Sequence, residues 1–524
     1  MKSHPFRCWC AVLLVFVGAV SVRGAVAFQV LYSFPAVFYT NSTFSPYPFV
    51  FPGTNGGNPF AALIQGMDGS FYGTTTEAYS GIFNGLNGTI FQLTTNATLN
   101  TLTSPGSYGA VVQRTYNGDF YGTTPKNNGI IFAMTTNGAS VLSSAFNGTN
   151  GLSPFGLMEG SDGNFYGTSY EGGPAYNSGD IYNVPDGFGT VFKITFNGEI
   201  TSLYSFTNGN DGAYPLGSLV QGTDGTFYGT ASEGGWNNAG TVFKITTNGV
   251  LTTLYSFTGG DDGYLPIAGL LQGTDGSFYG TTCFGGMYGT GVAGDGLGFG
   301  TLFRITTNGT LTTLASFNGT NGAAPLGGLI QGTDGNFYGT TFAGGQSLSV
   351  PWPSYSPYDV AFPFGFYPVP NGAGTVFMMT TNGAIITLVD FQGTNGSGPT
   401  AALLQANNGS FYGTTFYGGT NTPPGTNVNS VNGLSATNGF GTIFRLTINP
   451  PGPPALQTET VTNGTFNFTW SSVAGQMYQV QCACALGPTN WNALGSPIVA
   501  TNSTTTTNDT ISNLQQFYRV VLLR

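Results

Sequence analysis

The sequence predicts an all-β chain in which a closed, seven-bladed β-propeller is followed by a small β-sandwich. Three observations support this fold class. The string Phe-Tyr-Gly-Thr occurs seven times, short strand-like runs alternate with Asp-Gly and Asn-Gly turns, and the repeat is interrupted at both ends of the repeated region. The first and last copies begin at Phe71 and Phe411, which gives about 57 residues per repeat, and such self-similarity is typical of repeat architectures.

Each repeat contains four runs rich in Val, Ile, Thr, Tyr and Phe and bounded by Gly, Asn and Asp, which is the pattern of β-strands. In one repeat these runs are residues 215–221, 227–230, 240–246 and 251–257. Asn248-Gly249, between the last two runs, is the commonest two-residue hairpin signal. After residues 1–27, no stretch of the chain shows the spacing of apolar residues that is typical of a helix. Four antiparallel strands per repeat form the blade of a β-propeller.

The two ends of the repeated region are complementary. Residues 30–34 look like a fourth strand with no blade before it, whereas the last repeat stops after a third strand at 441–447. An open solenoid is the alternative, but a solenoid needs capping repeats, and closure of a ring pairs both ends. We therefore expect the N-terminal strand to complete the seventh blade of a propeller that spans residues 28–449.

Residues 1–27 have the features of a secretory signal peptide. Lys2 and Arg7 precede the apolar run 8–20, and Ala25-Val26-Ala27 fits a small-x-small cleavage site. A membrane anchor is the alternative, but the run is shorter than the ~20 residues that a membrane span needs. We expect a secreted or cell-surface protein with no transmembrane segment in the mature chain.

The composition excludes several classes of function. Without residues 1–27, eight basic residues face 21 acidic ones, a formal charge of −13, which argues against nucleic acid as a partner. His4, the only histidine, leaves with the signal peptide, which excludes a Ser-His-Asp or Cys-His nucleophile and a His-ligated metal. Cys283, Cys482 and Cys484 make no disulfide framework. We expect no cofactor and no bound metal.

Several repeats carry a longer string: Gly-Thr-Asp-Gly-Asn-Phe-Tyr-Gly-Thr-Thr, a Gly-Gly loop, Gly-Thr-Val-Phe-Lys-Ile-Thr-Thr-Asn-Gly and Leu-Tyr-Ser-Phe. This pattern resembles the GloVer (Gloeobacter/Verrucomicrobia-type) tandem repeat of exported bacterial proteins, over about four-fifths of the chain. Blade 2 departs most, at residues 114–118 and in its short loop at 125–128. The resemblance implies a secreted or cell-surface propeller and no established activity.

A stiff Pro-rich linker at residues 450–454 separates the repeats from residues 455–524. Short alternating runs after the linker suit a small β-sandwich of fibronectin III-like type. The segment also resembles a C-terminal module of verrucomicrobial exported proteins, with a Tyr-x-Val-Gln strand, an Asn-Trp pair and a closing Phe-Tyr-Arg. Cys482 and Cys484 alternate with Ala483, so we expect both to face the core as small residues.

Recurring charged and amide residues are candidate sites with structural alternatives. Asp68, Asp162, Asp224, Asp275 and Asp334 occupy Asp-Gly turns, where Asp bonds its own backbone. Glu171 and Glu233 follow the second strand and could form the carboxylate pair of a glycoside hydrolase. Asp211 and Asp261-Asp262 could bind calcium through oxygen ligands, although neither matches a known calcium loop.

One position near the central channel holds Gln in six blades and Glu159 in blade 3. The amides are Gln65, Gln113, Gln221, Gln272, Gln331 and Gln405. We expect them to bond backbone between blades, and Glu159, the only charge in this ring, is a candidate ligand contact. Lys193, Lys244, Arg304 and Arg445 share a third-strand position, which we interpret as a blade-surface feature rather than an anion site.

Two Pro-rich loops on the variable face of the propeller concentrate aromatic residues. We expect Tyr39 and Tyr47 in the loop at 35–58, and Trp352, Tyr355 and Tyr358 in the loop at 348–371, to contact a ligand. Rigid scaffolds often carry function on variable loops, and aromatic rings offer flat apolar area with a polar handle. The alternative is that these rings pack on each other and on the propeller.

The sequence thus predicts an exported, non-catalytic binding or cell-surface module that recognises a neutral glycan or a partner protein. A carbohydrate-active hydrolase or lyase that uses loop carboxylates or tyrosines is one alternative. A purely structural envelope protein is another.

Overall fold

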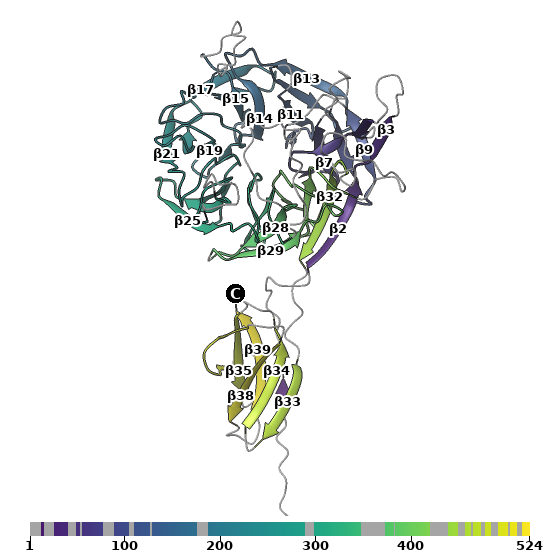
Figure 1. Cartoon of the computed structure of the whole chain (residues 1–524), viewed down its shortest axis with the longest axis vertical. Coiled ribbons are helices and arrows are strands. Elements are labelled where there is room, and N and C mark those ends of the chain that lie inside the picture. The colour runs from purple at the N-terminus through teal and green to yellow at the C-terminus, as the bar shows by residue number, and fades with distance from the viewer. Residues whose placement is uncertain are drawn as a thin grey trace, which may run out of the picture. The chain divides into compact units, whose positions relative to one another are not determined.

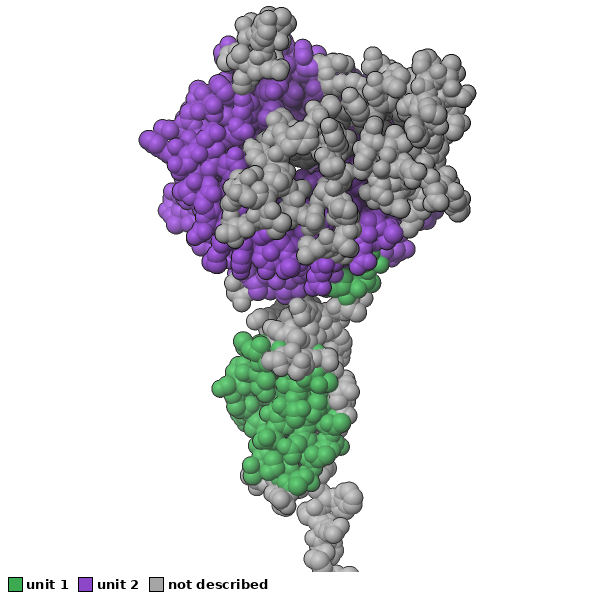
Figure 2. All heavy atoms as spheres, in the orientation of Figure 1, with its two compact units in different colours: residues 1–28, 446–524 green, residues 29–445 purple. Residues whose placement is uncertain are grey.

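The computed structural model describes residues 12–14, 26–39, 49–52, 55–76, 88–103, 109, 111–125, 128–174, 187–288, 298–346, 372–381, 383–419, 439–448, 456–462, 465–472, 477–483, 491–500, 504–510 and 516–523. Every regular element in these residues is a β-strand. No helix of the length and hydropathy needed to cross a membrane occurs among them. The chain divides into two compact units, residues 29–445 and residues 1–28 together with 446–524 (Figure 1 and Figure 2).

Residues 29–445 form seven blades arranged in a ring (Figure 1), which confirms the predicted fold class. Blade 1 contains β6 (Ile64–Gln65), β7 (Phe71–Thr76), β8 (Ile90–Leu93) and β9 (Leu99–Thr103), and β5 (Gly57–Pro59) also pairs with β7. Blade 2 contains β10 (Val111–Gln113), β11 (Phe120–Thr124), β12 (Ile130–Met134) and β13 (Ser140–Ala145). Blade 3 contains β14 (Leu152–Glu159), β15 (Phe165–Glu171), β16 (Thr190–Ile194) and β17 (Ile200–Ser205).

The remaining blades repeat the same antiparallel order. Blade 4 contains β18 (Val220–Gln221), β19 (Phe227–Ala231), β20 (Thr241–Ile245) and β21 (Leu251–Ser256). Blade 5 contains β22 (Leu271–Gln272), β23 (Phe278–Thr282), β24 (Thr301–Ile305) and β25 (Leu311–Ser316). Blade 6 contains β26 (Ile330–Gln331), β27 (Phe337–Thr341), β28 (Thr375–Met379) and β29 (Ile385–Asp390).

Blade 7 is built from both ends of the repeated region. It contains β30 (Leu404–Gln405), β31 (Phe411–Thr415), β32 (Thr442–Ile448) and, as its fourth strand, β2 (Val26–Ser33). Phe34, directly after β2, donates its backbone N–H to the carbonyl of Gly441 at 3.0 Å and is fully buried. The predicted closure by the N-terminal strand is therefore confirmed.

The Phe-Tyr-Gly string builds the seams between blades. The Phe ring of each blade packs on the Tyr ring of the preceding blade, with centroids 3.9 to 4.4 Å apart, and the seven pairs complete the circle. The closing pair is Tyr412 with Phe71 at 4.0 Å. The Gly is required because the third-strand Phe of the same blade lies over it. A Cβ on Gly229 would come within 2.7 Å of the Phe243 ring.

The Thr that follows this string joins blades near the centre of the ring. The hydroxyls of Thr168, Thr230 and Thr340 donate to the carbonyls of Gly217, Ala268 and Ala401 on the next blade at 3.1, 2.9 and 2.9 Å. Innermost backbones approach closely there, since a Cβ on Gly217 would lie 2.6 Å from backbone atoms of blade 5. Small residues near the axis are therefore needed for seven blades to close.

The C-terminal residues form two small sheets that share one core. One sheet contains β33 (Leu456–Thr462), β34 (Thr465–Ser471) and β38 (Thr504–Thr510), and the other contains β35 (Met477–Ala483), β36 (Asn492–Ala493), β37 (Ile498–Val499) and β39 (Gln516–Leu523). Both sheets are antiparallel except that β1 (Val12–Leu14) pairs with β39 in parallel. Phe466, Phe468, Trp470, Tyr478 and Tyr518 are central members of the core, and Cys482 packs against it as predicted. Cys484 lies outside the described residues.

Candidate functional site

The two faces of the ring are built differently. Because neighbouring strands of a blade are antiparallel, the connections between strands one and two and between strands three and four leave the ring on one side. We call this side the turn face. The connections between strands two and three, and those between blades, lie on the opposite side, which we call the loop face.

A closed circle of hydrogen bonds joins the blades at the turn face. In each blade, Gln or Glu159 at the end of the first strand accepts a backbone N–H from the turn of the preceding blade. The seven donor–acceptor pairs are Met67–Gln113, Thr115–Glu159, Ser161–Gln221, Thr223–Gln272, Thr274–Gln331, Thr333–Gln405 and Asn407–Gln65, at 2.8 to 3.1 Å. The predicted role of this position in bonding between blades is confirmed.

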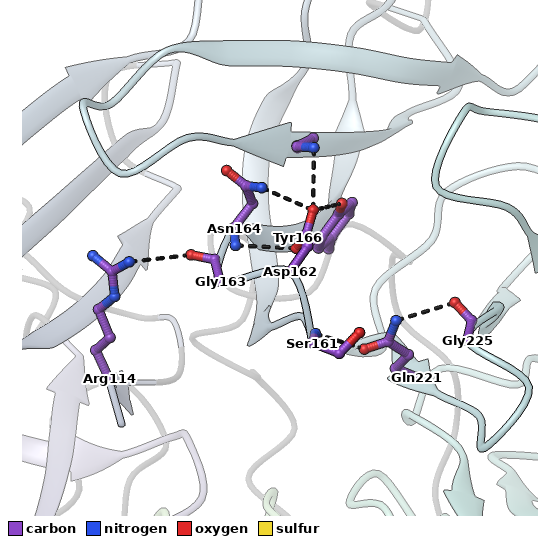
Figure 3. Close-up of polar contacts among 9 residues, drawn as sticks. Arg114, Ser161, Asp162, Gly163, Asn164, Tyr166, Gln221 and Gly225 are labelled. Carbon is purple, nitrogen blue, oxygen red and sulfur yellow. Dashed lines mark hydrogen bonds and ion pairs between the residues drawn. The ribbon is translucent and has the colours of Figure 1, made fainter. Parts of the chain in front are cut away.

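Glu159 is a member of this circle, with partners on both carboxylate oxygens. Oε2 accepts the backbone N–H of Thr115 at 3.1 Å and its hydroxyl at 3.2 Å. Oε1 lies 3.5 Å from Nε of Arg114. Arg114 also donates through Nη2 to the carbonyl of Gly163 at 3.3 Å, as Figure 3 shows. The geometry gives Glu159 a bond between blades 2 and 3, and its predicted contact with a ligand stays a prediction.

The recurring Asp residues hold their own turns, as predicted. In Figure 3, Asp162 Oδ1 accepts the backbone N–H of Asn164 at 3.1 Å, and Oδ2 accepts the Tyr166 hydroxyl at 2.8 Å. Burial raises the pKa of Asp162, but hydrogen bonds from Asn164, Tyr166 and Lys193 outweigh it and lower the pKa to about 2. Asp68, Asp224, Asp275 and Asp334 make the same two bonds in their blades.

Third-strand cations lie beside these carboxylates. Lys193 Nζ is 3.3 Å from Asp162 Oδ2, and Arg304 Nη2 is 3.0 Å from Asp275 Oδ2. Arg445, at the same position, donates to Gln29 Oε1 at 2.6 Å. The interpretation of this position as a blade-surface feature is confirmed for Lys193 and Arg304.

The central channel contains a cavity of about 300 Å³ toward the loop face. Its walls are residues 60–62, 109, 155, 216–219, 267–270, 326–329 and 400–402, so all seven blades contribute. These residues are Phe, Leu, Ile, Ala, Gly, Ser and Thr, without a charged side chain. The cavity therefore offers apolar surface and backbone carbonyls.

Glu171 and Glu233 lie near one tyrosine on the loop face. Tyr214 stacks on Tyr170 with ring centroids 4.8 Å apart and has a backbone φ of 56°, which is rare for an aromatic residue. Burial raises the pKa of Tyr214 to about 12, and the charges of Glu233 and Glu171 add to the shift. Burial also raises the pKa of Glu233. The two carboxylates thus share a neighbour, which sequence spacing does not show.

Three exposed apolar side chains on the loop face were not predicted from the sequence. Trp236 is 78% exposed in blade 4, and Met287 and Tyr288 are 73% and 46% exposed in blade 5. Trp236 and Met287 each follow a Gly-Gly pair, and their backbone N–H groups donate to Ser256 Oγ and Ser316 Oγ at 2.8 and 3.2 Å. The Gly-Gly pair that directly precedes Trp236 and Met287 is the sequence feature that could have identified these exposed positions.

The acidic turns before blades 4 and 5 are held by internal bonds. Asp211 accepts the Tyr204 hydroxyl at 3.0 Å and the Thr207 N–H at 2.9 Å, and Asp262 accepts the Tyr255 hydroxyl and the Thr258 N–H at 3.0 and 2.8 Å. No cluster of three or more metal-ligating side chains occurs among the described residues. These carboxylates stabilise turns.

Most of the aromatic residues predicted to bind a ligand lie outside the described residues. These are Tyr47, Trp352, Tyr355 and Tyr358. Tyr39 ends β3 (Ala36–Tyr39), which forms a hairpin with β4 (Phe49–Pro52) and places Tyr39 opposite Phe49. The segment at 35–58 is therefore partly a hairpin rather than a loop, and ligand contact through it stays a prediction.

Comparison with known proteins identifies the repeat. Residues 108–294 match the Gloeobacter/Verrucomicrobia repeat. No curated protein is significantly similar to the chain. Similar solved structures include a gluconolactonase from Xanthomonas campestris, with 12% identity over 63% of this chain and 97% of that chain and a TM-score of 0.35. A candidate 6-phosphogluconolactonase from Bacteroides uniformis shows 12% identity over 72% and 99% of the two chains, with a TM-score of 0.41.

A protein of unknown function from Bacteroides thetaiotaomicron is 9% identical over 80% of this chain and 76% of its own, with a TM-score of 0.39. Identities this low assign no activity to the chain.

Proposed function

We propose that this protein is an exported, non-catalytic binding module whose loop face recognises a neutral glycan. The observation that carries the proposal is the exposed side chain of Trp236, which is presented by a tightly bonded loop. The proposed export is based on the signal-like residues 1–27. We also propose that residues 455–524 form a fibronectin III-like module.

The loop that presents Trp236 is held by backbone geometry. Gly234 and Gly235 have φ values of 72° and 76°, and a Cβ on Gly234 would lie 2.7 Å from the backbone of Gly212. Gly235 N–H donates to the Gly209 carbonyl at 2.8 Å, and Gly234 N–H donates to Asn238 Oδ1 at 2.9 Å. A loop fixed in this way loses little entropy when its tip contacts a ligand.

The distribution of charge favours a neutral ligand. Of the cations described in the ring, Arg114, Lys193 and Arg304 bond to carboxylates near the turn face, and Arg445 bonds to Gln29. Glu171 and Glu233 lie on the loop face, so an anionic polymer would be repelled there. Trp and Tyr rings suit the apolar C–H faces of pyranose sugars while their polar atoms bond hydroxyl groups.

The test is binding of the mature protein to an array of neutral oligosaccharides, followed by titration with the best array ligand. Trp236→Ala with Tyr288→Ala should weaken binding at least tenfold. Phe196→Ala is the matched control, because Phe196 is 69% exposed but lies in a turn-face hairpin. Equal binding by the loop-face double variant and the control would refute the proposed surface.

The neighbourhood of Tyr214 favours a second candidate function, a carbohydrate-active enzyme. Glu233 is partly buried and its pKa is raised, which suits a general acid, and Glu171, whose charge also acts on Tyr214, would supply the second carboxylate. A screen against polysaccharides with Glu171→Gln/Glu233→Gln as the comparison separates the two functions. Cleavage by the wild type that the double variant lacks would favour the enzyme, and cleavage by neither protein would favour the binding module.

A further inference from the structure

A polar cluster on the C-terminal unit has no part in the proposed loop-face site. Gln481 on β35 and Arg519 on β39 are direct cross-strand partners. Trp491 immediately precedes β36, which pairs with β35 next to Gln481. Tyr478, Val480 and Tyr518 on the same strands belong to the buried core, whereas Gln481, Trp491 and Arg519 are only partly buried. The cluster therefore lies on the outer surface of this sheet.

The guanidinium of Arg519 is fixed by two contacts of different kinds. Its Nε donates to Gln481 Oε1 at 2.7 Å. Its Cζ lies 4.5 Å from the centroid of the Trp491 ring, which is a cation–π contact. The bond to Gln481 holds the edge of the guanidinium, and the indole covers one of its faces. Among the described residues, neither terminal nitrogen of the planar fork has a hydrogen-bond partner, so both can bond another group.

The charge of Arg519 is not neutralised within the described part of the chain. Arg114, Lys193 and Arg304 each lie within 3.5 Å of a carboxylate oxygen, whereas the described contacts of Arg519 are with an amide and an indole. Asp509, the nearest carboxylate in sequence among the described residues, accepts the Tyr518 hydroxyl at 2.9 Å on another strand. An oriented cation without a counter-ion is a recognition element for an anion.

We propose that Gln481, Trp491 and Arg519 form a binding site for an organic carboxylate. A guanidinium fork matches the planar geometry of a carboxylate and makes two parallel hydrogen bonds with it. Gln481 and Trp491 position the fork before the ligand arrives, so less freedom is lost on binding. Residues 455–524 contain two acidic and two basic residues, so the long-range repulsion expected at the acidic ring is absent from this unit.

Glucuronate and glucose are a matched pair of probes because they differ in the carboxylate. The mature protein, labelled with fluorotryptophan, is titrated with each sugar at constant ionic strength while the fluorine resonance of Trp491 is followed. Trp491→Phe identifies that resonance. Glucuronate should shift it in a saturable way in the millimolar range, and glucose should not. Acetate and N-acetylglycine as further probes show whether the carboxylate needs a sugar or a peptide attached to it.

Arg519→Lys keeps the charge but removes the fork and should weaken glucuronate binding at least tenfold. Gln481→Ala should weaken it several-fold while leaving Arg519 in place. Unchanged melting temperatures show that both variants are folded, and Gln481→Ala serves as the main variant if Arg519→Lys is unstable. Equal binding of glucose and glucuronate, binding of sulfate as tight as that of carboxylates, or full affinity in Arg519→Lys would each overturn the proposal.

Discussion

Removal of one aromatic side chain at the seam between blades 1 and 7 tests whether the propeller is closed through this seam. Phe71 in blade 1 packs on Tyr412 in blade 7 with centroids 4.0 Å apart and an interplanar angle of 28°. At the internal seam between blades 4 and 5, Phe278 packs on Tyr228 with centroids 3.9 Å apart and an interplanar angle of 25°. Both phenylalanines are almost fully buried. Phe71→Ala and Phe278→Ala are therefore matched perturbations of a closing and an internal seam.

Each substitution should destabilise the ring by about 3–5 kcal/mol, the usual cost of a buried Phe→Ala change, of which about 0.5–1.5 kcal/mol is the aromatic pair. An unfolding entropy of about 2.1 cal/mol/K per residue gives roughly 0.9 kcal/mol/K for a unit of this length, residues 29–445. The melting temperature should therefore fall by roughly 3–6 °C in both variants.

The decisive measurement is a double-mutant cycle in urea with Phe71→Ala and Tyr412→Ala. These residues are 341 positions apart, and they couple only if the ends of the repeated region meet. We expect a coupling of about 0.5–1.5 kcal/mol. Phe71→Ala with Tyr228→Ala is the control pair, whose effects should add within about 0.5 kcal/mol because the residues share no seam.

An open arrangement in solution would give a different result. Phe71 would then lack its partner, the coupling with Tyr412 would be absent, and Phe71→Ala would lower the melting temperature clearly less than Phe278→Ala. Either outcome would refute closure through this seam.

Three further predictions follow from the same contacts. Deletion of residues 28–34 removes most of β2 and the buried Phe34, so the melting temperature should drop by more than for any single substitution, and unchanged unfolding would contradict the role of β2. Tyr228→Phe removes a 2.7 Å bond to Asp224 and should cost about 1.5–3 kcal/mol in urea, whereas Tyr121→Phe, whose turn has Asn117 in place of Asp, should cost less. Burial, together with hydrogen bonds to Asp68 and Asp262, raises the pKa of Tyr72 and Tyr255 to about 12. The contribution of these tyrosines to the free energy of unfolding is therefore complete below about pH 10 and is lost as the pH rises toward 12. A free energy of unfolding that stays constant over this pH range would contradict these contacts.

The architecture could be predicted because it depends on residues that recur at a regular spacing along the chain. Seven copies of one string and the complementary ends at 30–34 and 441–447 determine the number of blades and the way they close. The roles of the turn Asp residues and of the Gln position also followed from local chemistry. What the sequence did not show is how the string works, because the stacking of Tyr228 on Phe278 joins residues of different blades.

The candidate site was less predictable because exposure depends on loop conformation. Trp236 follows a Gly-Gly pair in a short loop, and nothing in composition separates it from a buried Trp such as Trp470. Tyr214 is the neighbour that Glu171 and Glu233 share, because both charges raise its pKa. It lies between them in sequence, and its backbone has a positive φ that the sequence does not indicate. The sequence pattern singled out both carboxylates but not the tyrosine whose pKa both charges raise.

Departures from the repeat can be explained by contacts at a single seam. In the five blades with an Asp turn, the residue two positions before the Asp is Gly. There is little room for a side chain at this position, because a Cβ on Gly332 would lie 2.7 Å from both Asp334 and Tyr338. In the two blades whose turn carries Asn in place of Asp, the same position is Arg114 or Ala406.

Arg114 thus occupies the position where the loss of Asp permits a side chain, and it reaches across to blade 3. Blade 3 is the one blade with Glu159 in place of Gln, and the two residues meet at 3.5 Å. The extra positive charge in blade 2 is matched by a negative charge on the facing strand, while the backbone bond from Thr115 is kept at 3.1 Å. The departures therefore compensate each other across one seam, so the least typical blade fits into the ring without breaking the circle of hydrogen bonds.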